Sequence, residues 1–111
     1  MGYDMKTNSL PIPHSFMLHG QTIEVKYEDD LSAKESNRGV TLHGYNQIKL
    51  QSSVRGEPQP STWVEQAFCH ELVHEILYHM ESDKDEDEKF VNLFASLLHQ
   101  ALTTAEYGGK K

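Results

Sequence analysis

The sequence predicts an α+β fold in which a short three-stranded sheet, antiparallel or mixed, packs on two main helices. Three observations indicate this fold class. Short segments of alternating polarity occupy the first half of the chain, a loop with proline and glycine follows them, and two longer segments then show helical periodicity. The 111 residues correspond to a single domain, 1–111, which is large enough to bury a core.

An irregular segment precedes the first predicted strand. Residues 1–13 form this lead-in, because Pro11 and Pro13 disfavour a helix. Residues 21–27 alternate apolar and polar side chains and therefore predict a half-buried strand. The polar segment 29–38 is expected to hold a helical turn or a loop.

Two further short strands are predicted at 40–42 and 47–50. The Gly and Asn within residues 43–46 suit a hairpin turn between them. Segment 55–60 contains one Gly and two Pro and is expected to be a loop.

Two helices are predicted in the second half of the chain. The first covers 61–80 and begins with the capping-box spacing of Thr62 and Glu65. Its apolar residues recur at every fourth position, at Val64, Phe68, Leu72, Ile76 and Met80. The second helix covers about 85–104, and residues 105–111 are a frayed tail. The core stripe of this second helix is predicted at Val91, Phe94, Ala95, Leu98, Ala101 and Leu102.

The charge balance and the composition exclude several classes of function. The formal net charge is −7 and no basic stripe is present, so the sequence predicts no nucleic-acid partner. No apolar run approaches the ~18 residues of a spanning helix, so no membrane partner is expected. Cys69 is the only cysteine and the N-terminus has no apolar stretch of a secretory signal, which together predict a cytoplasmic protein.

The segment H-E-L-V-H on the first helix carries the predicted chemistry. His70 and His74 are four residues apart, so both imidazoles lie on one helix face and can reach one ion. Zinc in a catalytic site takes three protein ligands and lowers the pKa of water to about 7. Glu71 lies about 100° around the helix from His70, where its carboxylate can act as the general base.

The third ligand is expected from the acidic run that follows. Glu88 is the predicted ligand, because Asn92 lies one turn later on the same ridge and can accept the spare N–H of a ligand histidine. Asp87 is the rival, and Asp85 and Glu86 are weaker candidates.

The remaining polar candidates divide into three groups. His99 lies eleven residues after Glu88, about 16 Å along the helix axis, which is too far to share the ion. His79 is expected to be a surface or partly buried histidine, and Cys69 is expected to be a small core residue. One of five side chains could stabilise the oxyanion of a peptidase reaction: His14, His19, His43, Tyr45 or Tyr107.

Two segments resemble the ImmA/IrrE-type zinc metallopeptidases, which are gluzincin-like enzymes with H-E-x-x-H and a later glutamate. The segments are F-C-H-E-L-V-H-E-I-L-Y-H and E-K-F-V-N-L-F-A-S-L-L, and the resemblance covers residues 63–98. It implies a minimal zincin-like domain of a phage or prophage variant, with zinc ligands at His70, His74 and Glu88 and a catalytic glutamate at Glu71. The chain departs from the family pattern at Val91, where alanine is usual.

Two functions from different classes are therefore predicted. The first is a zinc metalloendopeptidase that hydrolyses peptide bonds of an intracellular protein, with the substrate extended along an edge strand at 47–50. The second is a non-catalytic, zinc-stabilised binding or regulatory module of phage origin, because a domain of this size can gain stability from such a staple. Glu71 distinguishes the two, since a structural metal site has no need of a base.

Overall fold

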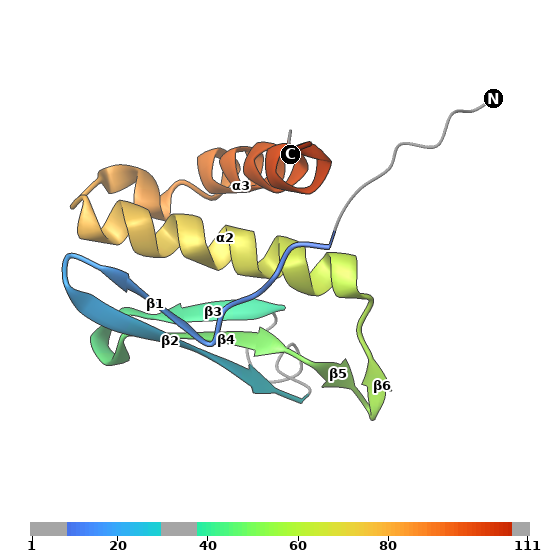
Figure 1. Ribbon diagram of the computed structural model, residues 1–111. Helices are drawn as coiled ribbons and strands as arrows, with labels where there is room; N and C mark the ends of the chain where they lie inside the picture. The colour runs from blue at the N-terminus through green and yellow to red at the C-terminus, as the bar shows by residue number, and fades with distance from the viewer. Residues whose placement is uncertain (1–8, 30–37, 108–111) are drawn as a thin grey trace.

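The computed structural model describes residues 9–29 and 38–107, which form three layers (Figure 1). The four-stranded sheet is the first layer, helix α2 lies on it, and helix α3 lies on the opposite side of α2. The elements follow in the order β1 (Ser15–Leu18), β2 (Gln21–Glu28), β3 (Gly39–Leu42), η1 (His43–Tyr45), β4 (Gln47–Gln51), β5 (Ser53–Val54), β6 (Glu57–Pro58), α2 (Ser61–His79), η2 (Asp83–Glu86) and α3 (Glu88–Thr104). The predicted α+β class is confirmed.

The main sheet has four strands rather than the predicted three. Its order is β1-β2-β4-β3, with β2 and β4 parallel and the two outer pairs antiparallel, so it is mixed. The unpredicted strand β1 joins β2 through His19 and Gly20, whose φ angles of 53° and 75° are those of a tight hairpin turn. The pair His-Gly is not one of the usual two-residue hairpin signals such as Asn-Gly or Asp-Gly, so the sequence did not mark this turn clearly.

The strand predicted as the substrate-binding edge is internal, which corrects that prediction. β4, Gln47–Gln51, lies between β2 and β3, and the edge strands of the sheet are β1 and β3. The pairing of β3 with β4 through η1 confirms the predicted hairpin, in which Asn46 adopts a φ of 52°. The sequence predicted this hairpin but not its place beside β2.

The predicted loops were only partly tested. Most of segment 29–38 lies outside the described residues, as do 1–8 and 108–111. Segment 55–60 is not simply a loop, because β5 and β6 form a short hairpin around Arg55 and Gly56. Within the described residues, no helix is both long and apolar enough to cross a bilayer.

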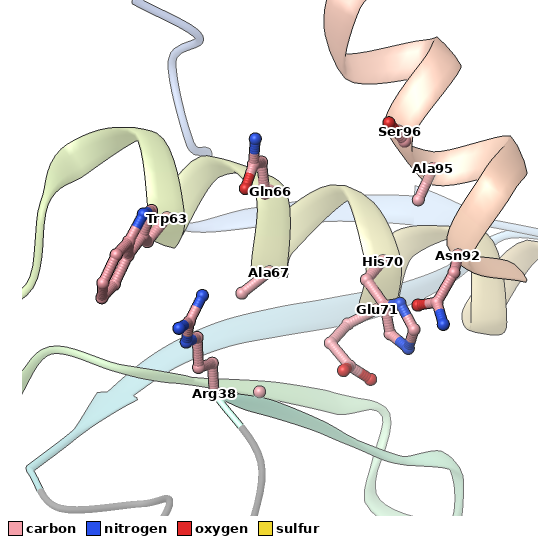
Figure 2. A pocket seen from close by; sticks show the side chains of 10 residues that line it. Arg38, Trp63, Gln66, Ala67, His70, Glu71, Asn92, Ala95 and Ser96 are labelled. Carbon is pink, nitrogen blue, oxygen red and sulfur yellow. The ribbon is translucent and has the colours of Figure 1, made fainter. Parts of the chain in front are cut away.

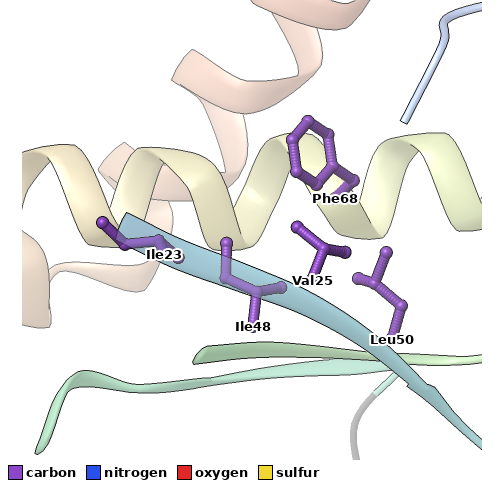
Figure 3. Close-up of a cluster of buried hydrophobic side chains, with 5 residues drawn as sticks. All are labelled: Ile23, Val25, Ile48, Leu50 and Phe68. Carbon is purple, nitrogen blue, oxygen red and sulfur yellow. The ribbon is translucent and has the colours of Figure 1, made fainter. Parts of the chain in front are cut away.

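The first hydrophobic core joins the sheet to α2. Four strand residues and Phe68 from α2 are buried together (Figure 3). The strand residues are Ile23, Val25, Ile48 and Leu50. They come from alternate positions of β2 and β4, so one face of the sheet is apolar, as the alternation predicted for β2.

The second hydrophobic core joins α2 to α3. Cys69, Val73 and Leu77 of α2 pack with Val91 and Ala95 of α3, which confirms Cys69 as a core residue. Helix α2 therefore buries two faces. The predicted single stripe is wrong at its end, where Ile76 and Met80 are 36% and 65% exposed.

The helix ends differ from the predicted ones for a local reason. Pro60 is the N-cap of α2 and gives no side-chain hydrogen bond, so the capping box with Thr62 is wrong. Helix α3 begins at Glu88 rather than at about 85 because the Asp87 side chain accepts a hydrogen bond from the Phe90 amide and caps it. Residues Asp83–Glu86 form the short helix η2 instead.

The predicted core stripe of α3 is also only partly correct. Val91 and Ala95 are buried, but Phe94 and Leu102 are 50% and 40% exposed. His99 and Thr103 are buried as well, although the predicted stripe did not include them.

Candidate metal centre

Three side chains from two helices converge beside the edge strand. His70 and His74 lie one turn apart on α2, and Glu88 is the first residue of α3. His70 Nε2 lies 3.2 Å from Glu88 Oε1, and His74 Nε2 lies 3.2 Å from Glu88 Oε2. One ligand atom of each residue lies within 4.8 Å of the others, so these residues could hold a metal ion.

The start of α3 explains why Glu88 rather than Asp87 joins the histidines. The Asp87 Oδ1 atom accepts the Phe90 amide at 3.1 Å, and the side chain is 45% exposed. Its carboxylate is therefore committed to the helix end, and the next residue projects toward α2. The η2 helix immediately before it shortens the connection between the two helices.

Replacing Glu88 and Asp87 by alanine, one at a time, tests which of the two carboxylates is a metal ligand. We expect Glu88→Ala to lower metal affinity by more than about 100-fold, because loss of a residue that only orients a ligand already costs 10–100-fold. Asp87→Ala should keep most of the affinity and cost about 1 kcal/mol of stability through the lost cap. Competition with a chromophoric zinc chelator measures the first quantity, and thermal melting measures the second. Greater loss of metal from Asp87→Ala would reverse the assignment.

Asp85 orients His74. The His74 Nδ1 and Asp85 Oδ1 atoms are 2.8 Å apart, which leaves His74 Nε2 facing Glu88. A carboxylate on the second ring nitrogen fixes the tautomer of a ligand histidine. Burial lowers the pKa of His74, but the Asp85 hydrogen bond and the charges of Glu71, Glu88 and Asp85 outweigh burial and raise it.

This orienting role was predicted for Asn92. Asn92 lines the cavity beside His70 (Figure 2), but within the described residues no hydrogen bond joins it to His70 or His74. Its role therefore stays a prediction. The sequence indicated Asp85 only as a weaker ligand candidate at the start of the second helix, whereas the residue lies in η2.

Glu71 is buried between α2 and the edge strand. Its exposed fraction is 6%, and Oε1 accepts a hydrogen bond of 2.5 Å from the Thr41 hydroxyl of β3. A Cβ on Gly39 would lie 3.1 Å from Glu71 Cγ, so glycine at this position of β3 lets the side chain fit. Burial raises the pKa of the Glu71 carboxyl, against the opposing effect of the Thr41 hydrogen bond.

A cavity of about 240 Å³ borders the three convergent residues, Glu71 and β3. Of the five candidates for the oxyanion, His43 alone is among the described residues that line this cavity. Tyr45 and Tyr107 are 77% and 81% exposed. The geometry therefore leaves His43 as the candidate that is near the site.

A buried carboxylate lies behind the site and was missed by the sequence analysis. Glu75 is fully buried, with Oε1 at 3.4 Å from His43 Nδ1 and 3.7 Å from His79 Nε2. His43 Nε2 in turn lies 3.5 Å from Asp85 Oδ2, so close polar contacts continue to the residue that orients His74. Helical periodicity does not mark Glu75, because a buried charge depends on partners from other elements.

His99 has a separate partner. Its Nε2 atom lies 3.0 Å from Glu65 Oε1, and both side chains are buried. His99 therefore holds α3 against the first half of α2 and is apart from the metal centre, as predicted. His79 is partly buried, which is one of the two positions predicted for it.

Comparison of the chain with protein-family models, with curated proteins and with solved structures found no match.

Proposed function

We propose that this protein is a zinc-dependent metallopeptidase in which Glu71 is the general base. One observation carries the proposal: a pair of imidazoles and a carboxylate converge next to a buried glutamate in one cavity. The four residues have the types and the helical spacing that zinc hydrolysis needs. The proposed substrate is a protein or peptide in the cytoplasm.

The donor set fits zinc. Bonds of about 2.0–2.1 Å at tetrahedral angles separate two ligand atoms by about 3.3 Å. His70 Nε2 lies 3.2 Å from Glu88 Oε1 and His74 Nε2 lies 3.2 Å from Glu88 Oε2, so each imidazole is close to that separation from a different oxygen of one carboxylate. Three protein ligands leave one position open. Bound zinc would polarise the scissile carbonyl and lower the pKa of water to about 7.

The surroundings of Glu71 suit a base. The Thr41 hydroxyl binds Oε1, so Oε2 is the atom that is free to take a proton. Burial raises the pKa of this carboxyl, and a base with a pKa nearer the working pH transfers protons more effectively. His43, which lines the same cavity, is the proposed donor to the oxyanion.

Edge strand β3 is the proposed docking site for the substrate backbone. Within the described sheet β3 pairs with β4 alone, and its residues Gly39, Val40 and Thr41 line the cavity of the metal centre. A peptide that adds to this edge as a further strand would lie across the metal centre. This replaces strand 47–50, which the sequence favoured.

A non-catalytic, zinc-stabilised binding or regulatory module is the alternative. It is favoured by the position of the site, whose ligand residues come from both α2 and α3 and would staple them. A structural zinc that links the two helices would need the three ligand residues but not Glu71.

Cleavage of a broad peptide library tests the proposal. Protein purified without added metal should contain one zinc per chain by elemental analysis, and it should cleave library peptides. A chelator should abolish the cleavage, and added zinc should restore it. Zinc-loaded protein that cleaves no member of the library would favour the alternative, and a chain that takes up no zinc would contradict both.

A further inference from the structure

A second cavity adjoins the metal centre. Its volume is about 410 Å³, and it shares the lining residues Gly39, His70 and Glu71 with the smaller cavity at the site. Figure 2 shows its lining side chains, with Arg38 and Trp63 at one end and His70 and Glu71 at the other. A substrate bound across the metal centre would therefore place a neighbouring side chain here.

Arg38 gives this cavity its electrostatic character. It is the only Lys or Arg among the described residues that line the cavity, in a chain whose net charge is −7. Neutral polar groups of Gln66, Asn92 and Ser96 also line it. The buried Glu71 carboxylate is held by Thr41. The cavity thus offers a permanent positive charge at the Arg38 end, and the one carboxylate among its described lining residues, that of Glu71, lies at the opposite end (Figure 2).

Trp63 holds the Arg38 guanidinium in place. Arg38 Cζ lies 4.1 Å from the centroid of the indole ring, within the range of a cation–π contact. The guanidinium carries five N–H donors in a planar fork, and within the described residues no hydrogen bond or ion pair engages those of Arg38. A positioned guanidinium with available N–H groups binds a carboxylate in bidentate fashion.

We propose that the cavity is a specificity subsite for a carboxylate of the substrate close to the cleaved bond, and that Arg38 binds it. This inference rests on the proposed peptidase function. The carboxylate belongs to an acidic side chain or to the C-terminus of the substrate. Both sources present the same group to Arg38, and the experiment separates them.

Trp63 is the only tryptophan in the chain, so its fluorescence reports occupation of this cavity directly. The zinc-loaded, full-length Glu71→Gln variant is titrated with capped alanine pentapeptides whose central residue is Glu, Gln or Lys. A fourth peptide carries central Gln and a free C-terminal carboxylate. We expect the Glu peptide to bind about 10–100-fold more tightly than the Gln peptide, the range expected for a charge-assisted hydrogen bond. Preference for the fourth peptide instead would assign the carboxylate to the C-terminus.

Three further substitutions in the same background test Arg38. Arg38→Gln should remove the preference for the carboxylate, and Arg38→Glu should shift it to the Lys peptide. Arg55→Gln is the matched control, because it removes the same charge from the β5–β6 turn, outside the lining of the cavity. Equal binding of the Glu and Gln peptides, no fluorescence response to any peptide, or a preference that survives Arg38→Gln would overturn the subsite.

The failure of the subsite and the failure of the peptidase proposal give different results. Selective binding by a protein that cleaves no peptide in its wild-type form would end the peptidase proposal and leave the subsite standing. Cleavage by the wild type with no preference for acidic residues or free C-termini would support the peptidase proposal and overturn the subsite.

Discussion

Replacing Glu71 by Gln is expected to reduce the rate of peptide hydrolysis by about 10²–10⁴-fold, the usual contribution of a general base. Zinc content should stay at one per chain, because His70, His74 and Glu88 are unchanged. The fold should also persist. Gln can still accept the Thr41 hydrogen bond through its side-chain carbonyl, and a neutral side chain suits this buried position, where burial raises the pKa of the carboxyl.

Initial rates of cleavage, elemental analysis and thermal melting measure these three quantities on one preparation. Glu57→Gln is the matched control, because Glu57 is an exposed residue of β6 and the substitution makes the same chemical change. Cleavage at the wild-type rate by Glu71→Gln would remove the catalytic role. If the biological effect of the protein also survived, the binding-module alternative would take its place.

His74→Ala is expected to abolish tight zinc binding and the stability that zinc contributes. Free zinc at 1,000-fold its dissociation constant stabilises a protein by about 4 kcal/mol. In a domain of roughly 100 residues each kcal/mol corresponds to a shift of about 4–8 °C in Tm. Zinc should therefore raise the Tm of the wild type strongly and that of His74→Ala very little.

The difference between zinc-loaded and chelator-treated Tm isolates the effect of the metal. His74→Ala also removes the contacts to Asp85 and Glu88, and this loss is present in both measurements and cancels. His14→Ala is the control, because His14 is exposed and does not line the metal-centre cavity. A zinc-dependent Tm shift in His74→Ala as large as in the wild type would contradict the ligand assignment.

The sequence by itself predicted those features that depend on local periodicity. The 3.6-residue period of the first helix put His70 and His74 on one face, and the structure brings their Nε2 atoms to the same carboxylate. The alternation in β2 correctly identified a half-buried strand. Each of these features depends on residues only a few positions apart in the sequence.

Helix ends were less predictable because short-range interactions compete there. Asp87 and Glu88 are adjacent carboxylates, and either could have reached the histidines on the evidence of spacing alone. The hydrogen bond from the Phe90 amide makes Asp87 the cap, and this places Glu88 as the residue that faces α2.

Only the tertiary structure decided what surrounds the site. The parallel pairing of β2 with β4 leaves β3 at the edge, and this brings Gly39 and Thr41 against Glu71. The contact of Arg38 with Trp63 joins the residue that precedes β3 to helix α2, 25 positions later in the sequence. Such contacts depend on strand order and on the packing of helix against sheet, and neither leaves a periodic signal in the sequence.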